Sequence, residues 1–503
     1  MSQATQSRVR EPHELESPEW RVLLPVVLYI TAIVLAFGYE IFSFNLTIDE
    51  EATALFTRAE RIEGSIAEGR WTMATLTGLL PTTVIPLVST AIGVGLSAIV
   101  WWVLARRFLG LSPWKAAIAC SVAGTFPVLA FLFSFSTIAW VIGIGSVLLL
   151  AFVMGLSSPL LRYKLLGVLA GAAAIGVYDT FIVAIAVLAL AVAARKGTFR
   201  SLIEGTVGAI AALAVSRLIG LLYSLVFGIP LGNYTAGFID IPGFFAHPLE
   251  RSGSAVQDVV GTFLLSSDRF GLTSPTLAVF SIVLLGAAIT AVVLERRAPG
   301  RSTVRIVALV GIVLVPFAVE ALAFAVVLRS MFYLPIVILA LASIAFSHDW
   351  QLRVPWRRLA VIAFASLTVV TVVANAIIVN RLFSTAATTY ALDLQLAFQI
   401  GQEKDLLLDG DATRELPIVV EGLHGWPEGP FTSVHETIGL SFFELNESRT
   451  AKFLKDHGVL VHQATEKEHD SVTDELDDMP SYPAEGWIRI ENDVLLLKFS
   501  ETD

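Results

Sequence analysis

The chain has 503 residues, of which 55% are hydrophobic and only 16% charged, and its mean hydropathy is +0.73. Soluble domains normally carry about 25% charged residues, so this composition excludes an ordinary soluble enzyme. Apolar runs of ~18 residues or more recur along the sequence, which predicts a polytopic membrane protein. The single cysteine, Cys120, excludes an intrachain disulfide.

Charge is distributed unevenly along the chain. Residues 383–503 contain 24 Asp and Glu against 8 Lys and Arg, whereas the remainder contains 20 acidic and 26 basic residues. This contrast predicts that the tail is a separate, acidic, water-soluble domain. Such a domain is a poor partner for nucleic acid or for anionic lipid, since both are negatively charged.

The apolar runs predict eleven membrane-spanning helices ahead of the acidic tail. These spans cover residues 23–43, 80–105, 114–133, 137–156, 160–177, 179–194, 203–226, 273–294, 304–327, 331–347 and 358–380. The predicted domains are an N-terminal tail (1–22), a transmembrane domain (23–382) with long loops at 44–79 and 227–272, and an α/β domain (383–503).

Lys and Arg in the short loops predict the orientation, because cytoplasmic loops of membrane proteins are enriched in these residues. With a cytoplasmic N-terminus, fifteen of them fall on the cytoplasmic side and seven on the outer side. The odd number of spans then places the acidic domain and both long loops outside the cytoplasm.

Several local patterns predict finer structure. The short spans around Tyr178-Asp179 predict a tight hairpin that turns there. In loop 227–272, FFAHPLE and DVVGTFLL are too short to cross a membrane and predict pieces that lie at its surface. In the tail, STAATTYALDLQLAFQIGQEKDLLLDG and NESRTAKFLKDHG predict helices, LPIVVEG and VLVHQAT strands, and WIRIENDVLLLKF a hairpin that turns at Asn492-Asp493.

Three consecutive acids, Asp49, Glu50 and Glu51, follow the first span. One interpretation is a helix N-terminus, with Thr47 or Asp49 as its cap and acids in the first turn. Another is functional, because a carboxylate at the membrane boundary can act as a general base on a substrate hydroxyl or bind a divalent metal. The two interpretations are compatible.

Charged residues within or beside the apolar spans also need an explanation, because inserting an arginine at the centre of a membrane helix costs ~2.5–3.5 kcal/mol of free energy. They are Arg217, Glu320 and Arg329, and Asp179 at the hairpin tip. Structural ion pairs, snorkelling and an ordinary turn residue are the simplest explanations. The functional alternative is that the arginines form a binding site for an anionic group, most naturally a phosphate.

Four short motifs in order resemble those of a known family. They are IDEE at 48–51, Gly69-Arg70-Trp71 before LLPTTVIPL, the hairpin AIGVYDTFI, and Arg329 in LRSMFYLP. With eleven or so spans and a small C-terminal domain, the chain is similar to the bacterial GtrII-type glucosyltransferases. The resemblance implies a GT-C fold in the bacterial cytoplasmic (inner) membrane. It also implies inverting transfer of a sugar, typically glucose, from polyprenyl phosphate to a surface glycan such as an O-antigen or cell-wall polysaccharide, outside the cytoplasm.

If the chain catalyses this reaction, each residue singled out above has an expected role. Asp49 is the first choice for the base that deprotonates the acceptor hydroxyl, and Glu50 the second. Arg329, and after it Arg217 or Arg70, would stabilise the departing lipid phosphate. The residues expected to hold the sugar are Trp71 and Tyr178 by stacking, and Asp179, Glu51 and Glu320 by hydrogen bonds.

The chain departs from the family pattern twice. Two aspartates often stand where this chain has Asp49-Glu50, so the identity of the base stays open. The family's hairpin tip usually reads Tyr-Gln, and Tyr178-Asp179 here would alter the choice of acceptor or add a metal ligand. The sequence requires no cofactor, although Asp49 and Glu50 are candidate ligands for Mg or Mn. The rival functions are a lipid-linked-sugar flippase or transporter, a polysaccharide polymerase or ligase, and a membrane receptor with an acidic sensor tail.

Overall fold

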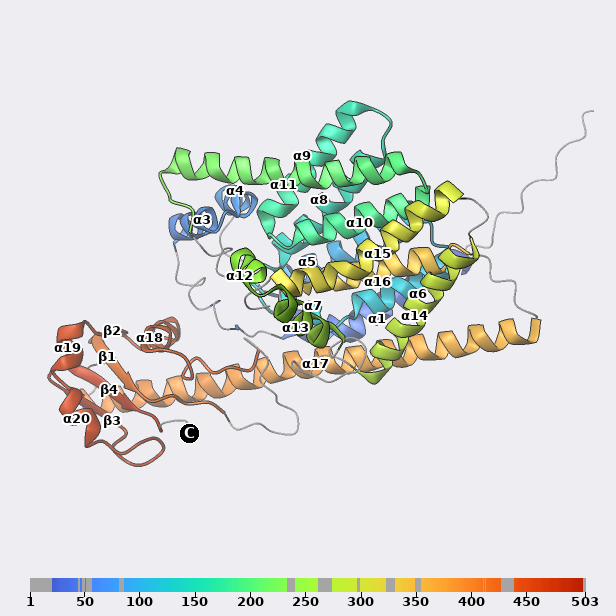
Figure 1. The fold of residues 1–503 in the computed structure, drawn as a ribbon. Helices are drawn as coiled ribbons and strands as arrows, with labels where there is room; N and C mark the ends of the chain where they lie inside the picture. The colour runs from blue at the N-terminus through green and yellow to red at the C-terminus, as the bar shows by residue number, and fades with distance from the viewer. Residues whose placement is uncertain are drawn as a thin grey trace, which may run out of the picture.

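The computed structural model is a helical bundle with a small sheet domain at one end (Figure 1). It describes residues 20–43, 46–47, 50, 57–80, 86–232, 240–260, 274–295, 299–322, 331–348, 354–409, 411, 413–426 and 438–500. The bundle helices are α1 (Trp20–Phe42), α3 (Arg58–Ala67), α4 (Trp71–Leu79), α5 (Pro86–Val103), the π-helical turn η1 (Leu104–Phe108), α6 (Pro113–Gly124), α7 (Val128–Phe133), α8 (Ala139–Ser157), α9 (Leu161–Val177), α10 (Phe181–Lys196), α11 (Phe199–Phe227), α12 (Ile241–Ala246), α13 (Pro248–Val260), α14 (Pro275–Leu294), α15 (Pro299–Leu322), α16 (Leu334–Ala345) and the start of α17 (Val354–Leu407).

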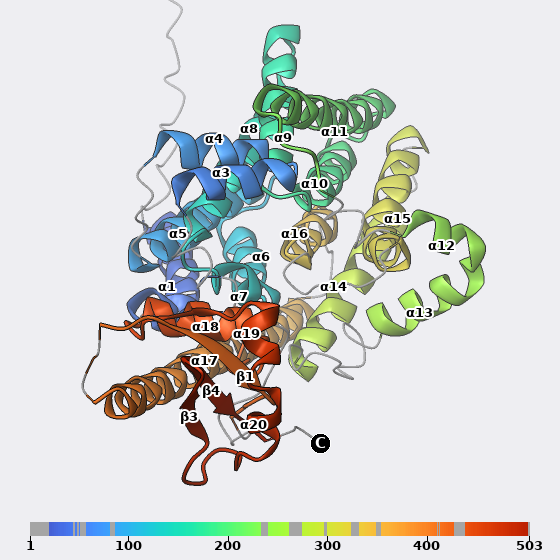
Figure 2. The same ribbon diagram turned by 90° about the vertical axis from the view of Figure 1, so that its left-hand side faces the viewer.

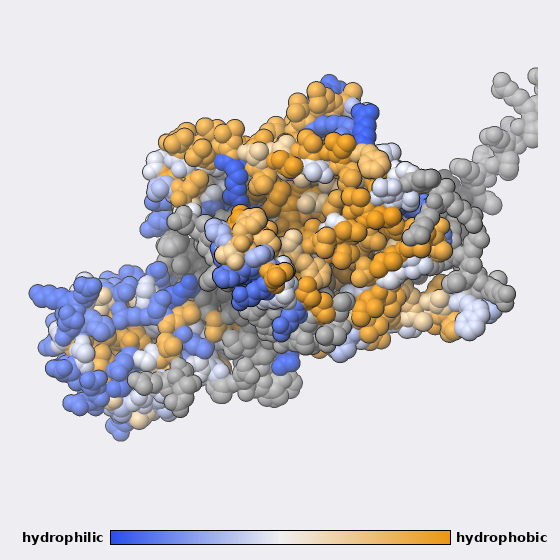
Figure 3. Space-filling model, viewed as in Figure 1, coloured by the Kyte–Doolittle hydropathy of each residue, from blue (hydrophilic) through white to orange (hydrophobic). Residues whose placement is uncertain are grey.

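Seven helices in the described part of the chain are long and apolar enough to cross a membrane. They are α1, α5 with η1, α8, α11, α14, α15 and α17. The protein is therefore a multi-pass membrane protein, and apolar side chains cover much of the bundle surface while polar ones cover the sheet domain (Figure 3). Each of the eleven predicted spans overlaps a helix, but four of them fall short of this length, so a count of eleven crossings stays a prediction.

The helices shorter than predicted have a physical reason. The third predicted span is interrupted between α6 and α7, where Pro127 removes a backbone donor from the helical ladder. Every residue of α7 and α16 is buried. Helices surrounded by protein do not need to match the thickness of the lipid core, because their polar ends find partners inside the bundle. Figure 2 accordingly shows α6 and α16 near the centre of the bundle.

The predicted hairpin at Tyr178-Asp179 is present, formed by α9 and α10. Helix α9 also runs back along α8, and the two backbones meet at Gly155 and Gly167. A Cβ added to Gly155 would lie 2.5 Å from the Gly167 Cα. Gly145 near the start of α8 lies against Phe181, so the α9–α10 turn is at the same end of the bundle as the α7–α8 loop.

Helix α17 joins the bundle to the C-terminal domain as one continuous element. It has 54 residues, or about 80 Å at 1.5 Å per residue. The sequence predicted a span ending at residue 380 and a separate helix after it, with a domain boundary at 382/383. No Gly or Pro stands between 381 and 400, so nothing interrupts the helix there. The apolar cores separate slightly later, between Ala386 and Tyr390.

The C-terminal domain contains the predicted strands, helix and hairpin. Its strands are β1 (Leu416–Glu421), β2 (Val461–Gln463), β3 (Ile488–Glu491) and β4 (Val494–Lys498), and its short helices are α18 (Glu447–Asp456), α19 (Glu466–Asp470) and α20 (Thr473–Asp477). The sheet order is β2-β1-β4-β3, with β1 parallel to both neighbours. Asn492 and Asp493 have φ of 49° and 65°, the left-handed conformations that a two-residue hairpin turn requires.

Loop 227–272 forms the two short helices α12 and α13, neither long enough to cross a membrane. The Asp240 carboxylate caps α12 and pairs with Arg251 at 3.0 Å. The backbone N–H of Asp240 donates to the Leu322 carbonyl, which ties this loop to the end of α15. Most of DVVGTFLL lies outside the described residues.

The close approach of α8 and α9 gives a test of the packing. We expect Gly155→Ala to lower the midpoint of thermal unfolding in detergent, because overpacking against backbone costs ~1–3 kcal/mol. The matched control is Gly95→Ala in α5, where nothing lies within 4 Å of an added Cβ. Equal midpoints for the two variants would show that α8 and α9 do not touch at Gly155.

Candidate functional site

The carboxylate of Glu50 is completely buried at the point where the chain leaves α1. One oxygen, Oε2, accepts from the Thr47 backbone N–H (2.9 Å) and hydroxyl (3.1 Å). The other, Oε1, accepts from the Ser136 hydroxyl (3.1 Å) and the Thr137 backbone N–H (2.7 Å). Both oxygens are therefore occupied, and Glu50 fastens the segment after α1 to the α7–α8 loop.

The same segment also contacts the C-terminal domain. Leu46 packs against the apolar core that contains Tyr390, and the charge of Glu50 acts on Tyr390. In the opposite sense, Ile438 of the C-terminal domain is buried in the apolar core of the bundle and not in that of its own domain. Burial raises the pKa of Glu50, and its hydrogen bonds with the backbone and side chains lower it by less. Glu50 thus lies at the junction of three parts: α1, the α7–α8 loop and the sheet domain.

A second polar cluster forms at the same end of the bundle, around Arg217. Arg217 Nη2 lies 3.0 Å from Asp179 Oδ1 in the α9–α10 turn. The Arg217 side chain is 48% exposed, and the pair contributes at most about 1 kcal/mol because water screens it. Arg217 lies in the second half of α11, whose 29 residues extend beyond the predicted span. Its ion pair with the turn agrees with the structural interpretation and leaves the guanidinium accessible.

The GRW motif brings the α3–α4 turn onto the same cluster. Arg70 pairs with Glu68 at 2.6 Å, and its guanidinium lies 5.0 Å from the centre of the Tyr178 ring. Gly69 has a φ of +76°, a conformation that glycine adopts without strain, and an added Cβ there would lie 3.7 Å from Arg217 Nη1. The two arginines therefore approach each other beside Tyr178.

Trp71 fixes the turn against α9 and α11. Its indole N–H donates to the Ser216 hydroxyl at 3.2 Å, and its ring centre lies 6.1 Å from that of Tyr223. A Cβ added to Gly176 of α9 would lie 2.5 Å from Trp71 Nε1, so only glycine allows this approach. The Trp71 ring is partly buried and forms a wall of the cluster.

Glu320 belongs to the same end of the bundle, in the last turn of α15. Its charge acts on Tyr333 at the start of α16. Tyr178 lies 6.2 Å from Phe332, ring centre to ring centre, which links the α9–α10 turn to the same segment. Three predicted site residues, Asp49, Glu51 and Arg329, lie outside the described residues.

Except for Thr47, which the sequence suggested as a helix cap, sequence reasoning missed the partners that organise these residues. The partners are Thr47, Ser136 and Thr137 around Glu50, and Glu68, Ser216 and Tyr223 around the arginines. Two signals were available: the spacing Thr47-x-x-Glu50 is that of a capping box, and SFST at 134–137 interrupts an apolar run. Within the described ranges, no three His, Cys, Asp or Glu side chains could share a metal ion. Metal binding by Glu50 would require its four hydrogen bonds to break.

Comparison with known proteins gives one match. The family model described as glucosyl transferase GtrII matches residues 38–347, more than half of the chain. The matched region begins within α1 and ends just after α16, so it contains Glu50, the Arg217 cluster and Glu320. Neither the curated proteins nor the solved structures gave a significant match.

The bonding of Glu50 predicts the result of a minimal substitution. In Glu50→Gln, whichever way the amide turns, its NH₂ group faces a backbone N–H of Thr47 or Thr137. An unsatisfied buried donor costs ~1–3 kcal/mol, so we expect a lower midpoint of thermal unfolding. The control is Glu60→Gln. Glu60 accepts from the backbone N–H and hydroxyl of Thr57, as Glu50 does from those of Thr47, but at an exposed site. If both substitutions change the midpoint equally, Glu50 does not hold the junction.

Proposed function

Because the chain belongs to the GtrII glucosyltransferase family, we propose that it transfers a sugar, namely glucose, from a polyprenyl-phosphate donor to a hydroxyl of a cell-surface glycan. The observation that carries this proposal is the cluster at one end of the bundle. Two arginines and two acids from three separate segments meet there beside Trp71 and Tyr178. Such a cluster joins phosphate-binding cations to aromatic surfaces that suit a sugar.

The surface next to Arg217 supports a lipid-linked donor. Helix α11 exposes Leu218, Leu221, Leu222 and Leu225. These four leucines share one face of the helix, because they stand at i, i+3, i+4 and i+7, and Leu221, four residues after Arg217, borders the Arg217 side chain. A lipid phosphate held by Arg217 would therefore have an apolar strip beside it for the attached tail. Arg70, which lies over the Tyr178 ring, would also contact this phosphate. Arg329, which precedes Phe332 in the chain, would do the same.

The acidic residues would supply the base and the hydrogen bonds that hold the sugar. Glu50 is buried with both oxygens occupied, so its role is to position its neighbour Asp49, which we propose as the base. The base takes the proton of the acceptor hydroxyl as that oxygen attacks C1, and the lipid phosphate leaves with the bonding electrons. In this inverting single displacement no covalent nucleophile is needed. Asp179, Glu51 and Glu320 would hydrogen-bond the sugar hydroxyls, and Trp71 and Tyr178 would stack against its ring.

The distribution of cations supports an outward-facing site. Lys164, Arg195, Arg200 and Arg305 gather at the end of the bundle opposite Glu50, where Arg305 donates to the Ala194 carbonyl. Cytoplasmic loops are enriched in such residues, so this end would face the cytoplasm. The cluster around Arg217 and the acidic sheet domain would then lie outside it.

The base assignment predicts that Asp49→Asn abolishes sugar transfer while the protein still inserts and folds. General-base catalysis contributes ~10²–10⁴-fold, so we expect a loss of that order. The measurement is sugar transfer by purified protein, with the exposed Glu63→Gln on α3 as a control that keeps its activity. Near-normal transfer by Asp49→Asn would remove Asp49 from the base role.

The arginines predict a ranking of activity. We expect Arg329→Ala to reduce transfer more than Arg217→Ala, because Arg217 is already paired with Asp179. The matched control is Arg251→Ala, since Arg251 makes a 3.0 Å ion pair with Asp240 outside the cluster. The reverse order of Arg329 and Arg217 in the same assay would exchange their roles.

A donor assay separates this function from the rivals. Purified protein is incubated with polyprenyl-phosphate glucose, with a lipid-diphosphate oligosaccharide and with each lipid alone. Consumption of the monophosphate donor with formation of a new glycosidic bond supports the proposal. Use of the diphosphate donor would indicate a polymerase or ligase, and counter-flow in liposomes without a new bond would indicate a flippase.

A further inference from the structure

An open cavity of about 590 Å³ lies at the end of the bundle opposite Glu50. It is formed where three elements end together: η1, α8 and α10. Three cationic side chains line it, Arg107, Arg195 and Lys196. Arg195 Nη1 donates to the Arg107 carbonyl at 2.7 Å, so the end of α10 is fixed against η1 and the cations are held together.

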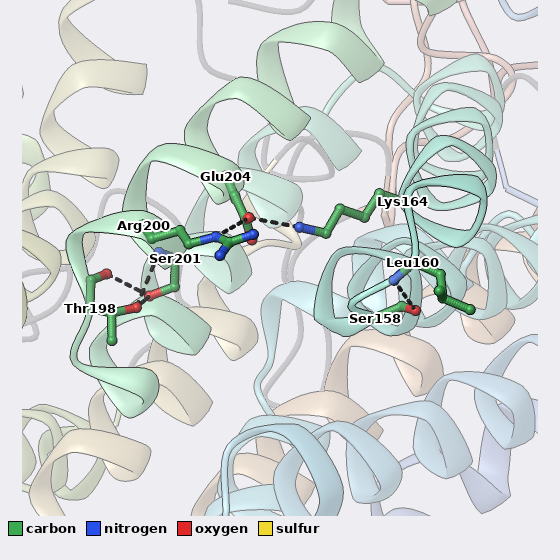
Figure 4. A network of polar contacts seen from close by, with 7 residues as sticks. All are labelled: Ser158, Leu160, Lys164, Thr198, Arg200, Ser201 and Glu204. Carbon is green, nitrogen blue, oxygen red and sulfur yellow. Dashed lines mark hydrogen bonds and ion pairs between the residues drawn. The ribbon is translucent and has the colours of Figure 1, made fainter.

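Among the described residues, acids compensate little of the charge of this cavity. No described carboxylate lies within ion-pairing distance of Arg107, Arg195 or Lys196. The nearest acid that acts on Lys196 is Glu204 of α11. Its carboxylate is already bound by Lys164 at 2.7 Å and Arg200 at 2.9 Å (Figure 4). Like charges held this close repel one another, so an anion in the cavity would be stabilised.

The cavity also contains an unused hydroxyl. Ser157 Oγ is buried and has no hydrogen-bond partner within the described part of the chain. Buried polar atoms normally have a partner, and those that lack one need an explanation such as a ligand. The adjacent Ser158 accepts a hydrogen bond from the Leu160 backbone N–H and lines the same cavity. Hydroxyls beside arginines are suited to the oxygens of a phosphate.

The other walls are apolar. Phe108, Met154 and Val192 line the cavity beside the cations, and Met154 is 51% exposed on the side of the bundle. These residues stand at the ends of helices that cross or pack within the membrane, where lipid headgroups meet the hydrocarbon core. A site with cations, hydroxyls and an apolar wall at this depth matches a charged headgroup followed by its acyl chains.

We propose that this cavity binds the phosphate of an anionic phospholipid from the leaflet at this end of the bundle. Arg107, Arg195 and Lys196 contact the phosphate, and Ser157 donates to one of its oxygens. The lipid joins η1, α8 and α10 and so stabilises the end of the bundle that is remote from the Arg217 cluster. The site is separate from the proposed transfer reaction and does not depend on it.

General enrichment of cations in cytoplasmic loops accounts for some of these residues, but not for their arrangement. Cations placed only to set orientation can remain dispersed in water. Arg200, for example, is 84% exposed and paired with Glu204. Around the cavity, three cations line one space together with Ser157, whose buried Oγ has no hydrogen-bond partner among the residues that the structure describes.

The test is lipid-dependent stability of the full-length protein in detergent micelles. We expect dioleoylphosphatidylglycerol to raise the midpoint of thermal unfolding, and dioleoylphosphatidylcholine at the same mole fraction to raise it less. Each cation near an anionic lipid surface contributes ~1 kcal/mol, so the double variant Arg107→Gln, Lys196→Gln should need roughly 5-fold more phosphatidylglycerol per cation removed. Arg195 is kept, because its bond to Arg107 supports η1.

Two further variants serve as a control outside the cavity and as a second test of the cavity. Arg200→Gln removes a cation from the same end of the bundle but outside the cavity, and should leave the titration unchanged. Ser157→Ala removes one oxygen and should weaken the lipid effect about 2- to 10-fold even if the double variant fails to fold. Equal titrations for the wild type, the double variant and Ser157→Ala would overturn the proposal. Inorganic phosphate that reproduces the full shift without lipid would overturn the lipid as the occupant.

Discussion

The buried carboxylate of Glu50 is the interaction on which the junction of α1, the α7–α8 loop and the sheet domain depends. A fully buried carboxylate is costly unless its oxygens are bonded, and here four donors from two separate segments supply those bonds. The chain therefore cannot leave α1 in any other direction without exposing or orphaning the carboxylate.

The same junction explains how the sheet domain remains attached to the bundle. Helix α17 passes without interruption from the bundle to the sheet domain, and one apolar core succeeds the other along it. The contacts of Leu46 and Ile438 across the junction then limit rotation about this long helix. The acidic domain is thus held at the end of the bundle where the Arg217 cluster lies.

The two ends of the bundle use arginine in different ways. Around Arg217 and Arg70, each cation has an acidic partner within 3.0 Å, so the cluster is nearly neutral overall and oriented. At the opposite end, Arg107, Arg195 and Lys196 converge on a cavity without acids among the described residues. The proposed transfer site would have to release its phosphate product, which favours partly neutralised cations, whereas the proposed lipid would be retained best by full charge.

The sequence by itself determined the membrane class, the helical positions, the strands and hairpin of the tail, and the GtrII family. These follow from local signals, namely apolar length, period-two alternation, turn residues and short ordered motifs. It also identified Arg217, Asp179, Arg70, Trp71 and Tyr178 as residues of interest, although it gave no reason for them to meet. Only the tertiary structure decided that Asp179 pairs with Arg217 and that Arg70 lies over Tyr178, because helix packing sets the distances between segments that are far apart in the chain. It likewise decided that Glu50 is a buried support, since burial depends on what surrounds a residue and not on its neighbours in the chain.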